Sequence, residues 1–377
     1  MAGMLSAIIL ARDEAANIAG AIDSVREVVD EVVVGDTGST DDTVIIAREH
    51  GARVVSIPWR SRFDEALNTL TDASSGDTVF RLDADERLVP EAAKALRRHA
   101  NTASLVAGAV VRRDIFDSAR PEESTEMWQV RLYRRVHGLR WHGRLHADLV
   151  TPTGTSPLVT RCEDVALLHF GLARDLAGGK LRRNVELLWA AVGDEPSDLN
   201  HLVELGRTLF VLKDPAAEEV LCRAARIVNG RAESLHPPAT IVCTLLEFVL
   251  TLPNHPAARE LLPERAEKLA IRWFADYPPL VWLRAQRRYQ AGDVEGSLTL
   301  LEHVRQLART CGYDRANSFD PRILGVDLAI NLAACYAALG RVDEASAALT
   351  PFVDDPVRRD TVRRSLAALT KAAGGVG

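Results

Sequence analysis

The strongest constraint on the fold is a regular alternation in the first half of the sequence. Short runs rich in β-branched residues, at 7–10, 32–34, 54–57 and 78–80, are separated by longer amphipathic segments. Those segments have the apolar spacing of helices. Continuous apolar strands joined by helices predict a mostly parallel, Rossmann-like sheet that is covered on both faces.

The second half of the sequence has a different pattern of apolar residues. Beyond about residue 171 the apolar residues recur at helical spacing, and three segments, 202–227, 283–307 and 332–352, resemble helix-turn-helix repeats. The last one has the packing residues of a tetratricopeptide repeat: Leu332, Tyr336, Gly340, Ala345 and Leu349. An ordinary helical bundle is the alternative. We therefore predict an α/β domain over residues 1–172 and an all-α, tetratricopeptide-like domain over 173–377.

Charge and cysteine content narrow the class of protein. The net charge of −6 comes entirely from residues 1–172, with 20 basic and 26 acidic groups, because residues 173–377 hold 26 of each. The sequence contains no block of consecutive basic residues of the kind that binds a nucleic-acid backbone. The five cysteines are widely spaced, which favours a reducing cytoplasm. The sequence starts directly in a strand-like run, and the longest apolar stretch, 240–252, is too short to span a bilayer and predicts a buried helix.

A polar turn follows the second predicted strand. Residues 35–43 read Gly-Asp-Thr-Gly-Ser-Thr-Asp-Asp-Thr, with Asp36 at the strand end and Gly38 free to form a tight turn. Ligands of open parallel sheets bind outside the carboxyl ends of the strands, so Asp36 is placed to accept hydrogen bonds from a nucleoside. The alternative is a turn that only caps the next helix.

Three carboxylates follow the fourth predicted strand. The sequence Leu-Asp-Ala-Asp-Glu at 82–86 places Asp83, Asp85 and Glu86 directly after an apolar run. Such crowding raises the carboxyl pKa values unless a cation is present. Mg²⁺ or Mn²⁺ shared with a diphosphate needs only one or two protein carboxylates. The sequence therefore predicts metal-assisted departure of a nucleoside diphosphate.

Two common nucleotide-binding motifs are absent from the sequence. There is neither a G-x-x-x-x-G-K-[ST] phosphate loop nor a G-x-G-x-x-G after the first strand, where residues 11–14 read Ala-Arg-Asp-Glu. A P-loop NTPase and a dinucleotide dehydrogenase are therefore not expected. Nucleotidyl transfer is disfavoured because a glycine-rich basic loop after the first strand is missing.

Together, residues 5–25, the turn at 35–43 and the D-x-D at 83–85 resemble family-two inverting glycosyltransferases with the GT-A fold. The tetratricopeptide-like tail makes the chain similar to a bacterial branch that includes peptide S-glycosyltransferases of the glycocin type. The resemblance covers the first 172 residues well and the tail only in architecture. It implies a nucleotide-sugar site and a Mn²⁺ or Mg²⁺ site. The nucleotide-sugar residues would be Ala11, Arg12, Glu14, Asp36, Asn68, Asp83 and Ala84, and the metal ligands Asp85 and His169.

The general base is less well defined by the resemblance. Family members have a His-Glu pair where this chain has His146 and Ala147, so the base would come from His146, Asp148 or the Glu163–Asp164 pair. His169 is expected in a flexible stretch between the two domains, from which it could close over a diphosphate.

The chain also departs from the family pattern at two other positions. Leu67 replaces a family arginine, and Asp13 replaces an asparagine. Basic residues could offset the lost cation, or they could form a solvated edge of the sheet: Arg131, Arg134, Arg135, Arg140 and Arg144.

The sequence thus predicts a metal-dependent inverting transferase that moves a hexosyl group from a UDP-sugar to a nucleophilic acceptor. The acceptor could be a Cys or Ser of a peptide, a saccharide or a small molecule. A helical-repeat tail suits an extended peptide and equally suits homodimerisation. The alternative is a degenerate transferase that acts as a helical-repeat interaction protein.

Overall fold

A computed structural model describes residues 3–117, 119–120, 124–171, 179–232, 234 and 239–374 of the chain. They form two compact units, Met1–Thr208 and Leu209–Gly377. The first is an α/β unit and the second is helical, as predicted. The predicted domain boundary at 172/173 falls outside the described residues. The first unit also contains helix α6 (Gly179–Asp194) and most of α7 (Leu199–Val211).

The first unit is built on a sheet of eight strands among the described residues, in the order β3-β2-β1-β4-β7-β6-β10-β5. Strands β3, β2, β1 and β4 are parallel, as the alternating pattern predicts. The strands are β1 (Leu5–Ala11), β2 (Glu31–Asp36), β3 (Arg53–Ser56), β4 (Thr78–Asp83), β5 (Glu86–Leu88), β6 (Ala107–Ile115), β7 (Ser124–Arg134) and β10 (Val159–His169). A separate hairpin pairs β8 (Arg140–His142) with β9 (Asp148–Val150).

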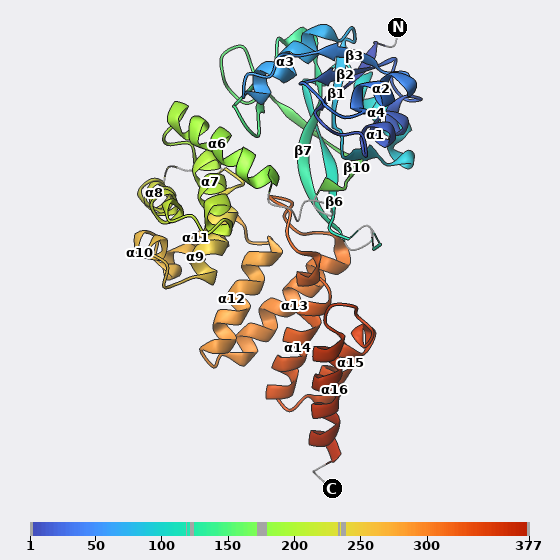
Figure 1. Ribbon diagram of the computed structural model, residues 1–377. Helices are drawn as coiled ribbons and strands as arrows, with labels where there is room; N and C mark the ends of the chain where they lie inside the picture. Colours follow the sequence, from blue (N-terminus) through green and yellow to red (C-terminus); the bar gives the residue numbers. More distant parts are fainter. Residues whose placement is uncertain are drawn as a thin grey trace. The chain divides into compact units, whose positions relative to one another are not determined.

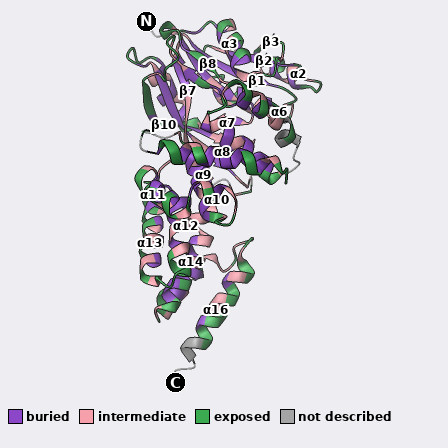
Figure 2. Ribbon diagram, turned by 90° about the vertical axis from the view of Figure 1, so that its left-hand side faces the viewer, coloured by how far each residue is buried: buried purple, intermediate pink, exposed green. Residues whose placement is uncertain are grey.

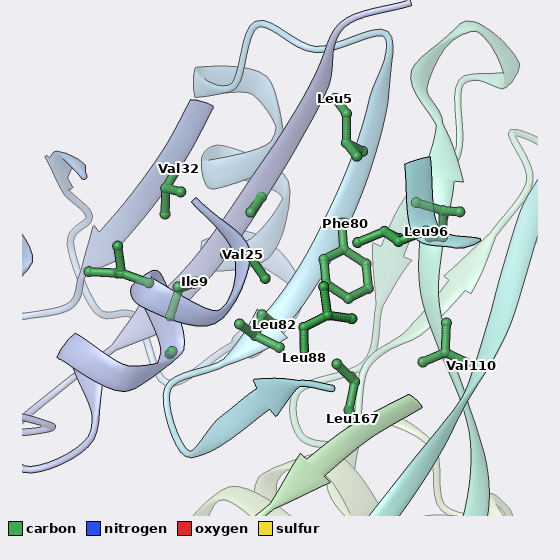
Figure 3. Packing of buried hydrophobic residues seen from close by; sticks show 14 of the residues in the cluster. Leu5, Ile9, Val25, Val32, Phe80, Leu82, Leu88, Leu96, Val110 and Leu167 are labelled. Atoms are coloured by element: carbon green, nitrogen blue, oxygen red, sulfur yellow. The ribbon is translucent and has the colours of Figure 1, made fainter. Parts of the chain in front are cut away.

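Alternate residues of the strands pack into two cores, one on each face of the sheet. On one face Leu5 and Ile9 of β1 belong to a cluster that includes residues of three helices (Figure 3). These are α1 (Ile18–Val25), α2 (Thr43–Glu49) and α4 (Ala93–Ala100). On the other face Ile8 packs with α3 (Phe63–Ala73) and with the β8–β9 hairpin. Burial on both faces explains why these strands read as continuous apolar runs.

The middle of the sheet differs from a simple parallel order. Strand β7 runs antiparallel to both β4 and β6, and β10 is parallel to β6. Strand β10 ends at His169, where it pairs with Glu86 of β5. His169 therefore lies at the end of a strand of the sheet and not in a flexible stretch, which corrects the expectation from the sequence.

The second unit consists of helices that follow one another along the chain (Figure 1). They are α8 (Ala216–Arg231), α9 (Val242–Thr251), α10 (Ala257–Glu260), α11 (Pro263–Trp273), α12 (Pro278–Gln290), α13 (Val294–Thr310), α14 (Val326–Ala338), α15 (Val342–Leu349) and α16 (Arg359–Gly374). The predicted repeats at 283–307 and 332–352 correspond to α12–α13 and α14–α15, whose packing residues form one core.

In the second unit, buried and exposed residues alternate along the helices (Figure 2). Helix α9, predicted as a buried helix from its apolar sequence, has Val242, Leu245, Leu246 and Val249 fully enclosed. Within the described residues, no helix combines the length and apolarity that a membrane crossing requires.

Candidate functional site

A cavity of about 350 Å³ lies at the carboxyl ends of β1 and β4. Strand register brings these ends together with that of β2, because Ala11 is opposite Asp36 and Leu10 is opposite Asp83. The lining residues are Leu10, Ala11, Arg12, Glu14, Thr37, Trp59, Phe63, Leu67, Arg81, Asp83, Ala84, Asp85, His146, His169 and Asn184. The cavity therefore collects eight of the residues expected at the site: Ala11, Arg12, Glu14, Asp83, Ala84, Asp85, His146 and His169.

Asp85 and His169 face each other in this cavity. The Nε2 atom of His169 lies 3.7 Å from Oδ2 of Asp85, and both side chains are largely buried. On the other side of the ring, Nδ1–H donates to the carboxylate of Asp114 at 2.6 Å. Asp114 is fully enclosed on β6. A buried carboxylate that fixes the imidazole and leaves Nε2 available is the usual arrangement behind a histidine metal ligand.

The surroundings of His169 favour a positive charge next to Asp85. Burial by itself would lower the pKa of His169, but the hydrogen bond to Asp114 and the nearby charge of Asp85 raise it above its ordinary value. Gly171 leaves the space that the pair needs, because a Cβ atom there would lie 2.6 Å from both Oδ2 of Asp85 and Nε2 of His169. An imidazole nitrogen and a carboxylate oxygen that converge in this way fit a divalent ion such as Mn²⁺.

Asp83 belongs to a buried ion-pair network rather than to a free metal site. Its carboxylate accepts hydrogen bonds from Arg131 at 2.7 Å and from Arg81 at 3.1 Å. Burial opposes its ionisation, but the guanidinium groups of Arg131 and Arg81 hold the pKa of Asp83 well below its usual range. Arg131 also donates to the fully enclosed Glu86 at 2.6 Å. Of the three carboxylates after β4, only Asp85 is therefore free of an arginine partner among the described residues.

The turn after β2 is closed by its own aspartate. The Asp36 carboxylate accepts the backbone N–H groups of Gly38 at 3.3 Å and Ser39 at 3.0 Å, and Gly38 has a positive φ of 102°. Asp36 is almost fully buried and does not line the cavity. Asp13 is also engaged in this turn, because its carboxylate accepts the N–H of Thr40 at 2.7 Å. The extra negative charge of Asp13 therefore points to the turn.

Two arginines bring positive charge to the cavity. Arg12 follows β1, and Arg81 lies within β4 with its guanidinium 4.9 Å from the ring centre of Trp141. The sequence did not identify Arg81, because it lies inside an apolar strand. Leu67, the position of the missing family arginine, also lines the cavity. An edge-to-face pair of Trp59 and Phe63, 5.0 Å apart, forms an apolar wall.

Three sets of predicted residues are not brought to the cavity. The Asn68 amide donates to the backbone C=O of Trp141 and accepts from its N–H, each at 2.9 Å, so it anchors β8 to α3. Asp164 pairs with Arg98 and with His99. These hydrogen bonds, that of His99 foremost, lower the pKa of Asp164. The predicted basic cluster also does not line the cavity: Arg131, Arg134, Arg135, Arg140 and Arg144 bind other protein groups.

His146 and Asp148 lie on the β8–β9 hairpin, at one side of the cavity. His146 lines the cavity, has a positive φ of 55° and lies 4.0 Å from Glu204. Such backbone strain in a non-glycine residue is concentrated at functional sites. Asp148 does not line the cavity. Loss of hydration and the charge of Asp198 raise the pKa of Asp148.

The first unit matches a known domain family. Residues 6–154 match the family model described as glycosyl transferase family 2. A TPR repeat-containing protein of Synechococcus elongatus is 31% identical over 222 residues, which cover 54% of this chain and 52% of that protein. An uncharacterized glycosyltransferase of Rickettsia felis is 45% identical over 92 residues, or 23% of this chain and 30% of that one. The chain thus spans about half or less of the length of the curated relatives it matches.

Glucosyl-3-phosphoglycerate synthase of Mycobacterium tuberculosis is 42% identical over 92 residues, covering 22% of this chain and 28% of the synthase. A crystal structure of that synthase with Mn²⁺ and UDP-glucose covers 29% of this chain and 44% of its own, at 35% identity and a TM-score of 0.27. The predicted GT-A-like α/β unit followed by helices agrees with the family model and with the repeat-containing relative. The N-terminal part of this chain is thus similar to glycosyl transferase family 2 domains, a helical region follows it, and one relative of the chain is a TPR repeat-containing protein.

Proposed function

We propose that this chain is a metal-dependent, inverting glycosyltransferase that moves a hexosyl group from a UDP-sugar to a nucleophilic acceptor. The observation that carries the proposal is the pair of Asp85 and His169, whose ligand atoms face each other 3.7 Å apart in a cavity at the strand ends. The family 2 domain and the relative named glucosyl-3-phosphoglycerate synthase support glycosyl transfer as the reaction.

The nucleotide would lie between the turn after β2 and the end of β4. Ala11 and Arg12 would contact the uridine part, with Asp36 behind them holding the turn in shape. Asp85 and His169 would hold Mn²⁺ or Mg²⁺, which neutralises charge on the diphosphate when it is bound. Arg12 and Arg81 are placed to donate to phosphate oxygens.

In the reaction, the acceptor nucleophile attacks the anomeric carbon on the face opposite the diphosphate. The bond between that carbon and the phosphate oxygen breaks, and its electron pair stays on the UDP. The acceptor loses a proton to a base, and of the predicted bases His146 is the one that lines the cavity. Positioning and charge stabilisation supply most of the acceleration.

For the acceptor we propose a Cys or Ser of a peptide. A pocket of about 150 Å³ in the helical unit supports an extended chain as ligand. Its lining is rich in amides, which pair well with peptide backbone: Gln286, Tyr289, Gln290, Ser297, Asn331, Ala334 and Cys335. The same surface could join two copies of the chain.

Unpaired cysteines in the described part favour a cytoplasmic location.

A donor screen tests the proposal. UDP-glucose, UDP-galactose, UDP-N-acetylglucosamine, GDP-sugars and TDP-sugars are added to the full chain with Mn²⁺, and thermal shift and slow hydrolysis of the donor are measured. We expect stabilisation and turnover with one or more UDP-sugars. If a folded sample neither binds nor hydrolyses any of these sugar nucleotides, the proposed glycosyltransferase activity is refuted. That result would support the alternative function of a helical-repeat interaction protein.

A further inference from the structure

A second group of metal-ligating side chains, which are not part of the lining of the sugar-nucleotide cavity, lies at the corner between α6 and α7. The ligand atoms of Glu195, Asp198 and His201 all lie within 4.8 Å of one another. They follow the spacing E-x₂-D-x₂-H, so the corner itself brings them together. Glu195 and His201 line a pocket of about 310 Å³ together with His142 of the β8–β9 hairpin.

The imidazole of His201 is the most informative member of the group. The residue is only 7% exposed, and its Nδ1 atom has no hydrogen-bond partner among the described residues. Nδ1 lies 3.4 Å from Oδ1 of Asp198. A tetrahedral ion with ligand bonds of about 2.0–2.1 Å separates neighbouring ligand atoms by about 3.3 Å. A buried ring nitrogen left without a partner is uncommon, and an ion between it and Asp198 would satisfy it.

The distribution of charge at the α6–α7 corner also favours binding of a cation. Asp194 is neutralised by Arg144 at 2.5 Å and Arg62 at 3.3 Å. In contrast, the ion-pair partners of Glu195 and Asp198 within the described ranges are imidazoles. His142 Nε2 lies 3.0 Å from Glu195, and His201 lies beside Asp198. Neither carboxylate therefore has an arginine or lysine partner in the described part of the chain.

Helix capping explains only part of this arrangement. Asp198 precedes α7 and accepts the backbone N–H of His201 at 2.9 Å, as a capping residue does. A cap accounts for Asp198, but it requires neither a buried imidazole beside it nor Glu195 on the other side. We propose that Glu195, Asp198 and His201 bind a transition-metal ion of the Zn²⁺ class, with His142 positioning Glu195.

The ligand set selects the type of ion. Imidazole nitrogen suits Zn²⁺ and Co²⁺, whereas Mg²⁺ prefers oxygen ligands and keeps its waters. The hydrogen bond from His142 to Glu195 provides the outer partner that usually orients a ligating group. The site is thus distinct from that of Asp85 and His169 in place and in chemistry.

The proposed ion would connect two parts of the first unit. His142 of β8 is opposite Asp148 of β9 in the hairpin, and His146 lies between them. An ion held at the α6–α7 corner, with His142 bonded to one of its ligands, would fix the hairpin against α7. It would then position His146 in the sugar-nucleotide cavity without touching the reacting atoms.

Cobalt titration of the full chain tests the site. The protein is stripped of metal and carries Asp85→Asn and His169→Gln, which remove the first site, and Co²⁺ binding is followed by visible absorption. We expect a single Co²⁺ equivalent that Zn²⁺ displaces and excess Mg²⁺ does not. His201→Gln should abolish this signal, and Glu195→Gln should weaken binding by more than about tenfold. Glu186→Gln, an exposed change on α6, should leave binding unaltered.

Because His201 is buried, its variant is also checked for folding by circular dichroism. If it does not fold, the partly exposed Glu195 provides the decisive variant. The site is refuted if the chain lacking the first site binds no Co²⁺, or if Glu195→Gln and a folded His201→Gln bind Co²⁺ as tightly as their parent.

Discussion

The Nε2 atom of His169, at the end of β10, lies 3.7 Å from Oδ2 of Asp85, in the turn after β4. The two residues are 84 positions apart in the sequence, and the pairing of β10 with β5 brings them together. Asp114 holds the imidazole from behind at 2.6 Å. The fold thus provides two ligands in fixed positions at the edge where a diphosphate would bind.

Asp114→Asn should weaken Mn²⁺ binding without unfolding the protein. The change keeps the shape of the side chain but removes the charge that supports His169, and loss of such a partner costs about 10–100-fold in metal affinity. Calorimetric titration with Mn²⁺ measures the effect. Asp117→Asn, in the segment that follows β6, is the matched control and should bind normally. Equal affinities of the two variants would contradict the role of Asp114.

Gly171→Ala should block the metal site by crowding. The new methyl group would lie 2.6 Å from both Oδ2 of Asp85 and Nε2 of His169, well inside van der Waals contact. Gly193→Ala is the control, because a Cβ there would meet no atom within 4 Å apart from its chain neighbours and the backbone of its own helix. Mn²⁺-induced thermal stabilisation should disappear in the first variant and persist in the second. Full stabilisation of the Gly171 variant would place the ion elsewhere.

Arg81→Met should weaken UDP binding while leaving uridine binding unchanged. The Arg81 guanidinium of β4 lines the cavity, where it would donate to a phosphate oxygen of UDP. Loss of a charged hydrogen bond of about 1.5 kcal/mol corresponds to a roughly tenfold loss of affinity. Arg140→Met removes an exposed arginine that pairs with Asp72, so it controls for loss of charge. A parallel loss of uridine and UDP affinity would show that Arg81 only shapes the cavity.

The stabilisation conferred by Mn²⁺ should increase with pH. The folded-state pKa of His169 is raised above 6.5, so its protonated form stabilises the metal-free protein fully below pH 6.5. That contribution is lost as the pH rises through the folded pKa. A metal ion binds the neutral imidazole ring, so the stabilisation conferred by bound metal increases as the pH rises. Melting temperatures with and without Mn²⁺ should therefore diverge as the pH increases, and His169→Gln should abolish the divergence.

The sequence predicted the part of the fold that local patterns describe. The apolar runs at 7–10, 32–34, 54–57 and 78–80 all lie within or overlap parallel strands, and the carboxylates that follow them lie at one edge of the sheet. Helical periodicity likewise identified the repeat-like pairs α12–α13 and α14–α15. These features depend on neighbouring residues, whose spacing is visible in the sequence.

Features that depend on distant pairings were not predicted. Strand β7 inserts between β4 and β6, and Thr78 pairs with Arg134 across 56 positions. That insertion buries Arg131 against Asp83 and removes it from the basic cluster expected at the site. The support of His169 by Asp114 follows in the same way from the pairing of β10 with β6. The partners of Asn68 and Asp164, which are Trp141 and His99, likewise depend on contacts between residues that are distant in the sequence.

Calorimetric titration of the full chain with UDP, in the presence and absence of Mn²⁺, tests the central claim most directly. We expect UDP binding that requires Mn²⁺, is lost in Asp85→Asn and is retained in Asp72→Asn, a change at an exposed ion pair. UDP binding that is independent of Mn²⁺, or that survives unchanged in Asp85→Asn, would contradict a metal-dependent sugar-nucleotide site at Asp85 and His169.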